Sequence, residues 1–157
     1  MNREGQILHE WKGYFHSWLA YLMDDGSVIR NAVAPDAPVF YAGGMAGRIE
    51  EISNKSEVTW QFEYATEDYQ VHHDIAVLPN GNVLSISYDH RSKEELVEAG
   101  RKAEFIPKDG LWFEKIIEVK PIKPSGGEIV WEWRFWDHLV QDQDPSKPNY
   151  GVVADNP

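Results

Sequence analysis

The sequence predicts an all-β fold made of repeated four-stranded units, and three observations lead to this prediction. A Trp-centred pattern occurs three times, a turn pattern with Asp-Gly or Asn-Gly occurs twice, and further strand-like runs lie between them. Within the runs, apolar and polar residues alternate, which is the period of a half-buried strand. Four short strands in roughly 40 to 50 residues is the spacing of one propeller blade. We therefore expect a partial β-propeller.

The Trp-centred pattern begins each unit. Its three copies are GQILHEWKGY, SEVTWQFEYA and GEIVWEWRFW. Aligned positions hold Ile7, Val58 and Ile129, then His9, Trp60 and Trp131, then Trp11, Phe62 and Trp133. Each copy is predicted to be a strand. The tryptophans Trp60, Trp131, Trp133 and Trp136 are expected to pack between blades, although any one of them can instead form the wall of an aromatic-ligand site.

A hairpin follows each of the first two Trp-centred copies. The two segments are WLAYLMDDGSVIR and DIAVLPNGNVLSIS. Asp-Gly and Asn-Gly adopt the positive φ angles that tight hairpin turns require. Further strands are expected at GRIEEI and FEKIIEV, which complete the units.

One segment is predicted to be helical, and another is predicted to be a loop. The helical stretch is SKEELVEAGRKAEF, where Ser92 and Glu95 have the spacing of a capping box. We expect it to be a short insertion between strands. The stretch QDQDPSKPNYG is rich in Pro, Asp and Asn and is predicted to be a loop.

The number of units bears on domain organisation. A chain of 157 residues normally forms one domain, so residues 1–157 are taken as a single unit of structure. Propellers close with about four to eight blades, whereas about two and a half to three units fit here. We therefore expect a partial propeller domain that is truncated at both ends, or copies that assemble into a homo-oligomer, because an open arc exposes sheet edges.

Charge and hydropathy exclude several partners. The net charge is −11, with 26 acidic and 15 basic residues, so nucleic acid is a poor partner and an anionic substrate needs a local pocket of donors. No apolar run approaches the roughly 20 residues of a membrane span, and no signal peptide is recognisable. Cysteine is absent, which excludes disulfides and leaves the compartment open.

The polar cluster His72, His73 and Asp74 precedes the second hairpin. The first unit has Ser17, Trp18 and Leu19 at these positions, so the fold itself does not require the cluster. It is predicted to lie near the start of an inner strand, close to the central channel where propellers bind ligands. Two alternatives stay open. The histidines can be structural, or they can bind a metal together with His90 or His138.

The segments HHDIAVLPNGNVL, GEIVWEWRFWDHL and QDQDPSKPNYG together resemble the arylsulfotransferase family, over about Arg48 to Pro157. The resemblance implies a six-bladed propeller that moves a sulfuryl group from an aryl sulfate to a phenol through a sulfohistidine, without a nucleotide donor or other cofactor. It also implies a periplasmic or extracellular location. The alternative is a ligand- or carbohydrate-binding propeller without catalysis.

The resemblance assigns the channel-lining histidine to His73, with His72 adjoining it. Asp74 is expected to orient an imidazole or to cap a local turn. His138 is expected to line the channel, while His90 and Arg91 are candidates for substrate binding. The later family residues, including the sulfurylated histidine, are not recognisable before Pro157. Residues 1–157 alone are therefore expected to hold part of an active site and to be inactive.

Overall fold

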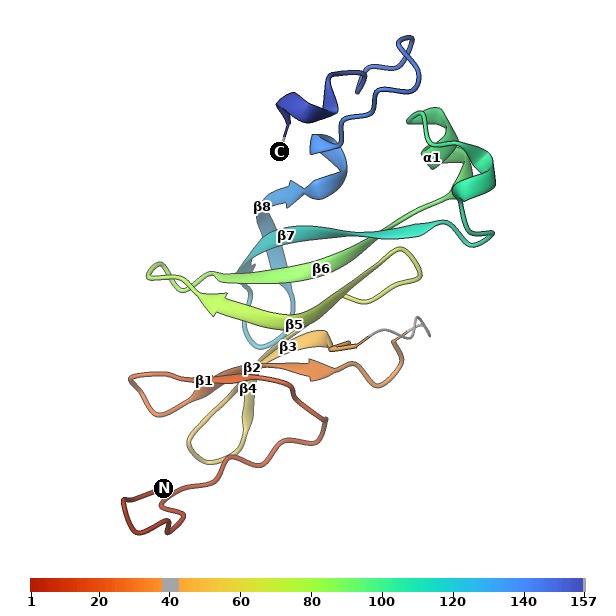
Figure 1. The fold of residues 1–157 in the computed structure, drawn as a ribbon. Helices are drawn as coiled ribbons and strands as arrows, with labels where there is room; N and C mark the ends of the chain where they lie inside the picture. Colours follow the sequence, from red (N-terminus) through yellow and green to blue (C-terminus); the bar gives the residue numbers. More distant parts are fainter. Residues whose placement is uncertain (38–42, 157) are drawn as a thin grey trace.

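The computed structural model describes residues 1–37 and 43–156, and these form two four-stranded antiparallel sheets stacked on one another (Figure 1). In each sheet the strands follow chain order. The first sheet contains β1 (Ala20–Leu22), β2 (Val28–Val33), β3 (Gly47–Ile52) and β4 (Val58–Glu63). The second contains β5 (Tyr69–Val77), β6 (Val83–Arg91), β7 (Leu111–Pro121) and β8 (Gly127–Arg134). The all-β prediction is confirmed.

Both predicted hairpins are present. The β1–β2 turn has Gly26 at φ +81°, and Met23 N donates to Ser27 O at 2.8 Å. The β5–β6 turn has Gly81 at φ +84°, and Leu78 N donates to Asn82 O at 2.8 Å. Glycine has no Cβ to clash in this left-handed conformation, which explains why the Asp-Gly and Asn-Gly signals located the turns.

The predicted strand in the first Trp-centred copy is wrong. The second and third copies form β4 and β8 by pairing with β3 and β7, whereas residues 5–14 contain no strand. Instead, Trp11 Nε1 donates to Gly26 O at 3.0 Å and Lys12 N donates to Ser56 Oγ at 2.9 Å, while Ile7 is 73% exposed. A strand forms where a neighbouring backbone accepts its hydrogen bonds, and residues 5–14 pair with none of the described strands.

The helical insertion is shorter than predicted. α1 spans Lys93–Glu98, and the predicted capping box between Ser92 and Glu95 is present. The helix stops because Gly100 takes the left-handed conformation at φ +96°, which ends the helical hydrogen-bond pattern. A separate 3₁₀ turn, η1 (Ala103–Phe105), follows. The loop prediction for residues 141–151 is confirmed, since no helix or strand occurs there.

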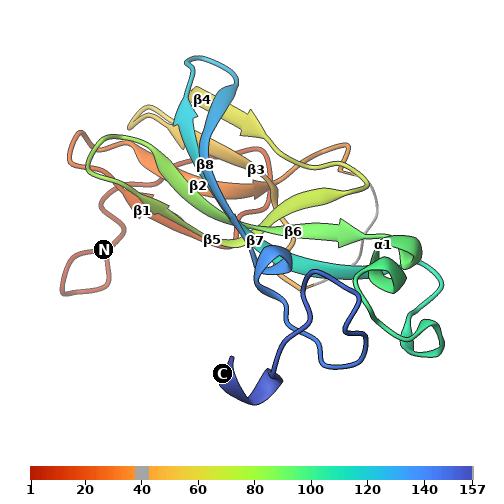
Figure 2. The same cartoon turned by 90° about the horizontal axis from the view of Figure 1, so that it is seen from above.

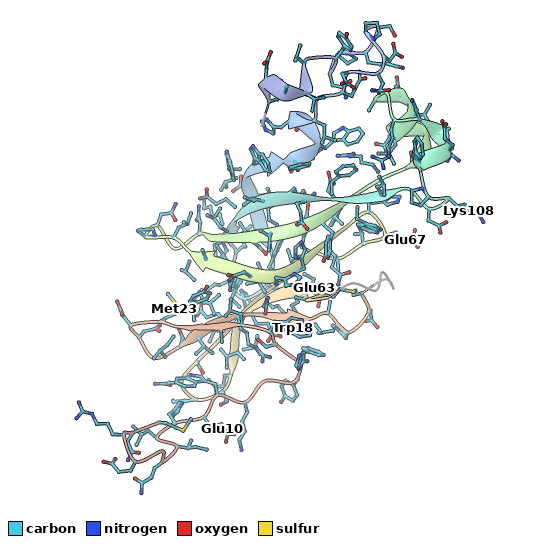
Figure 3. The ribbon with its side chains drawn as sticks, viewed as in Figure 1. Glu10, Trp18, Met23, Glu63, Glu67 and Lys108 are labelled. Carbon is cyan, nitrogen blue, oxygen red and sulfur yellow. The ribbon has the colours of Figure 1, made fainter. Side chains whose placement is uncertain are left out.

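One hydrophobic core lies between the sheets, where side chains from both fill the space (Figure 3). Its buried members from the first sheet are Ile29, Ile49, Trp60 and Phe62, and those from the second are Val71, Ile75, Val83, Ile117 and Val119. Seen from above, the second sheet lies across the first (Figure 2). Core members two residues apart occur in β4 (Trp60 and Phe62) and in β7 (Ile117 and Val119), as the alternation of a half-buried sheet requires.

The four conspicuous tryptophans differ in their surroundings. Trp60 is fully buried between the sheets, and its indole Nε1 donates to Gly126 O at 2.8 Å. Trp131, at the aligned position of β8, is 48% exposed. Trp133 and Trp136 are half-buried. Packing between sheets is thus confirmed for Trp60, whereas Trp131 lies on the outer face of the second sheet.

None of the helices within residues 1–37 and 43–156 has the length and hydropathy needed to cross a bilayer.

Candidate functional site

The His72, His73 and Asp74 cluster forms a bulge within β5. The flanking register pairs are Val71 with Ser87 and Ile75 with Ser85. Residues 72–74 therefore oppose the single residue Ile86, so β5 carries two extra residues here. The prediction that the cluster precedes a strand needs correction, because these residues lie in the middle of one. Bulges of this kind redirect side chains and are frequent beside active sites.

His73 has a backbone conformation that is uncommon for a residue with a side chain. Its φ is +47°, in the left-handed region. Such conformations persist only where surrounding contacts hold them, and they are concentrated at functional sites. The imidazole is exposed, unlike that of His72. The bulge therefore turns one ring toward solvent and the other into the protein.

Hydrogen bonds to β2 and to the segment before β3 hold the bulge in place. His73 N donates to Gly44 O at 2.8 Å, and the Asn31 side-chain amide donates to His73 O. Asn31 is 1% exposed, and its Oδ1 accepts hydrogen bonds from Trp18 N and Leu19 N, each at 3.2 Å. One buried amide thus links β2, the segment before β1 and the bulge.

His72 is buried and has partners at both ring nitrogens. It is 3% exposed and stacks on Tyr88, with ring centroids 3.8 Å apart. Its Nε2 lies 2.8 Å from Glu114 Oε2, and its Nδ1 lies 2.8 Å from His73 Nδ1. Burial lowers the pKa of His72 below its usual value, against the opposing attraction of Glu114. A neutral His72 is the form that this environment favours at neutral pH.

These contacts fix where protons reside. An ionised Glu114 only accepts hydrogen bonds, so the proton on neutral His72 lies on Nε2. His72 Nδ1 then carries a lone pair and accepts from His73 Nδ1–H. His73 consequently has its free position at Nε2, where it accepts or releases a proton. The arrangement is a carboxylate–imidazole–imidazole relay that ends at an exposed ring.

Glu114 was missed by the sequence reasoning. It lies on β7, directly across from Tyr88 on β6. The register of β7 depends on the insertion between β6 and β7, which contains α1 and η1. No local pattern in the sequence relates Glu114 to His72, which is 42 residues away.

Asp74 has different partners from those that an orienting carboxylate would have. Its Oδ1 accepts from Ile75 N at 2.6 Å and from the Tyr21 hydroxyl at 3.1 Å. This second hydrogen bond raises the pKa of Tyr21. Asp74 thus bonds the adjacent backbone and connects β5 to β1, and Glu114 is the carboxylate that contacts an imidazole.

His90 lies on the same face of β6 as Tyr88, two residues further along. Its Nε2 is 2.7 Å from Asp109 O, so this nitrogen donates to a carbonyl. Its ring packs on Trp112, with centroids 4.9 Å apart, and Trp112 packs edge-on against Tyr88 at 6.3 Å. His90 is therefore connected to the relay through aromatic rings rather than by a hydrogen bond.

Arg91 anchors the helical insertion. Its guanidinium lies 2.6 Å from Asp89 Oδ2 and 3.2 Å from Glu95 Oε1, and it stacks over Trp136 at 5.2 Å. Two carboxylates thus neutralise the charge that substrate binding would use.

His138 is at the other edge of the sheet from the relay. It ends η2 (Phe135–His138), directly after β8, and stacks on Trp133 with centroids 4.8 Å apart. Since β5 and β8 are opposite edges of the second sheet, three strand spacings, or about 14 Å, separate them. The structure therefore does not bring His138 together with His73.

A metal site was left open by the sequence. Among the residues that the structure describes, no three or more His, Asp or Glu side chains gather as a metal ion requires. His90 and His138, which such a site would recruit, have the other partners described above.

The buried position of His72 predicts a pH effect on stability. Because folding lowers the pKa of His72, the unfolded chain binds a proton at this residue more readily than the folded chain does. The contribution of neutral His72 to the free energy of unfolding is therefore complete above about pH 6.5. It is lost as pH falls through that value toward the lower folded pKa. Urea unfolding at about pH 7.5 and about pH 5 should show less pH dependence in His72→Gln than in the wild type. An unchanged difference between the two pH values would contradict this assignment.

Gly44 is expected to be essential for the position of His73. Its φ is +69°, and a Cβ there would lie 2.4 Å from three atoms of the His73 ring. Gly81 has φ +84° with nothing within 4 Å, so it is a matched control. Gly81→Ala should cost about 1–2 kcal/mol in unfolding free energy, and Gly44→Ala should cost more and shift the His73 ring signals in NMR spectra. Unshifted His73 signals would contradict the packing described here.

Comparisons with known proteins leave the family unassigned. No protein-family model matches the chain, and neither the curated proteins nor the solved structures include a significant match.

Proposed function

We propose that this chain contributes part of the active site of an aryl sulfate sulfotransferase, with His73 as its general acid and base. The observation that supports this most is the exposed His73 imidazole whose exchangeable position is restricted to Nε2 by His72 and Glu114. A general acid or base must present its proton at a defined point toward the reacting atom. The resemblance of HHDIAVLPNGNVL to the arylsulfotransferase family supplies the reaction type.

In the first half of the proposed reaction, an imidazole from outside residues 1–157 attacks sulfur. A bond from sulfur to that nitrogen forms and the bond from sulfur to the phenolic oxygen breaks. The leaving phenolate takes the proton from His73 Nε2. Expulsion of a phenolate benefits from such a donor, since the parent phenol has a pKa near 10.

In the second half, His73 acts as the base. The acceptor phenol gives its proton to the neutral Nε2 and attacks sulfur, and the sulfur–nitrogen bond breaks. The two half-reactions restore His73 to its starting protonation state. The buried, neutral His72 keeps Nδ1 of His73 occupied throughout, so the proton returns to the same nitrogen.

The proposed parent fold is a β-propeller of the arylsulfotransferase type, with each sheet as one blade. The outer face of the second sheet supports this, because Ile86, Ile116 and Trp133 are register partners across β6, β7 and β8 and form an apolar strip. A further sheet would bury that strip. Residues 5–14, which share the sequence pattern of β4 and β8, would pair in the same way with the third strand of another unit. A periplasmic or extracellular location belongs to the same proposal.

The test is an assay of the full-length protein with nitrophenyl sulfate as donor and phenol as acceptor, without any nucleotide. We expect nitrophenolate release that depends on phenol, together with phenyl sulfate as product. Without acceptor, the protein should gain the mass of one sulfuryl group. Absence of acceptor-dependent release from a folded protein would overturn the proposal and favour a ligand- or carbohydrate-binding propeller.

A further inference from the structure

A cavity lies where the helical insertion meets the segment after β8. Its volume is about 420 Å³, and α1, η1, β7 and residues 136–149 contribute its lining. Small-molecule sites in proteins have volumes of about 300–1,000 Å³. In Figure 1, α1 and the C-terminal segment lie beyond the second sheet, on the side away from the first sheet. No residue of β5 lines the cavity, so it is separate from the His73 site.

The interior of the cavity is aromatic and aliphatic. Phe113 and Trp136 meet edge to face, with ring centroids 5.2 Å apart at 68°. Leu96, which is 2% exposed, and the side chains of Leu139 and Val140 complete this surface. Aromatic pairs of this geometry accept a further ring in stacked or edge-on contact. The interior therefore suits a planar ring.

The charged side chains among the described lining residues of the cavity are two cations. Arg101 and Lys102 are adjacent in the lining, and none of its described residues is an Asp or Glu. This composition departs from that of the whole chain, which has 26 acidic residues against 15 basic ones. A local cationic rim is what an anionic ligand requires to overcome the repulsion of a protein with net charge −11.

Specific contacts build the walls of the cavity. The Asn149 side-chain amide donates to Ala99 O at 3.0 Å, and Gln141 N donates to Asn149 O at 3.1 Å. Gly100 packs so closely on Gln141 that a Cβ would lie 2.9 Å from its Cδ. The segment after β8 is thus docked on the helical insertion, which gives the cavity a defined shape.

We propose that this cavity binds a small aromatic anion, meaning a planar ring system with one sulfonate, sulfate or carboxylate group. The ring would contact Phe113 and Trp136, and the anionic group would lie at Arg101 and Lys102. Arg91 stacks on Trp136 but is neutralised by Asp89 and Glu95, so Arg101 and Lys102 supply the charge recognition. Binding here does not depend on sulfuryl transfer at His73.

The test is calorimetric titration of the full-length protein with 2-naphthalenesulfonate and with its neutral analogue 2-naphthalenesulfonamide. We expect saturable binding of the sulfonate, and binding of the sulfonamide weaker by at least about tenfold, the scale of one lost hydrogen bond to a charged group. The double variant Arg101→Gln, Lys102→Gln should lose about as much sulfonate affinity. Lys55→Gln, which removes an exposed lysine of the β3–β4 turn, should lose none.

Three results would overturn the proposal. They are no binding of the sulfonate by the folded protein, equal affinity for the neutral analogue, and unchanged affinity in the double variant. Loss of binding in His73→Ala would also overturn it, because the ligand would then occupy the other site. If binding follows the expected pattern while sulfuryl transfer is absent, the cavity proposal stands and only the proposed function fails.

Discussion

Replacing His73 by alanine in the full-length protein is expected to reduce turnover of nitrophenyl sulfate by at least about a hundredfold, the usual contribution of a general acid or base. The variant loses the only exposed nitrogen of the relay, so the leaving phenolate has no proton donor and the acceptor phenol has no base. The loss should be larger still for aryl sulfates whose phenols are less acidic than nitrophenol, because departure of those phenolates depends more on protonation. Turnover of a series of aryl sulfates measures both effects.

His138→Ala is the matched control for this variant. His138 is also an exposed histidine, but it stacks on Trp133 at the opposite edge of the sheet, so its removal should leave turnover within about twofold. Glu114→Gln should lower turnover less than His73→Ala and should move the pH dependence of the rate, since an amide no longer restricts His72 to one tautomer. Full activity in His73→Ala with loss in His138→Ala would reverse the assignment.

Trp60→Ala is expected to destabilise the protein by about 3–5 kcal/mol. The side chain is fully buried between the two sheets, and its removal leaves a cavity and breaks the hydrogen bond from its indole Nε1 to Gly126 O. Trp131→Ala, at the aligned position of the repeat, should cost less than about 1 kcal/mol, since that ring is 48% exposed. Urea unfolding followed by circular dichroism measures both values.

The comparison between the two tryptophans also reports on the outer face of the second sheet. If Trp131→Ala proves as destabilising as Trp60→Ala in the full-length protein, another layer must cover Trp131 there. This outcome would support a propeller in which a further blade packs on β8. A small cost for Trp60→Ala would contradict the packing of the core itself.

Local features of the fold could be predicted from the sequence because their causes are local. The turns at Gly26 and Gly81 follow from the conformational freedom of glycine, and the capping box of Ser92 and Glu95 follows from their spacing. The prediction of a strand at residues 5–14 was wrong because the alternation of apolar and polar residues indicates only a half-buried face. A strand also requires a partner strand to pair with. The sequence pattern of a strand therefore locates candidates and does not locate their partners.

The candidate site could be predicted only in part. His72 and His73 stand out as adjacent histidines absent from the first unit, but the contact with Glu114 depends on the register of β6 and β7 across a helical insertion. The left-handed conformation of His73 depends on hydrogen bonds from Asn31 and to Gly44. These are contacts between distant segments, and short-range patterns do not encode them.

The bulge in β5 also has a consequence for how such a site arises. Because it adds two residues rather than one, Val71 and Ile75 still face the same core, and the side chains after the bulge keep their orientation. An insertion or deletion of an even number of residues at this point leaves the strand in phase. An ancestor with an uninterrupted strand could therefore gain the histidine pair by such an insertion, and a descendant could lose it, without substitutions in the hydrophobic core.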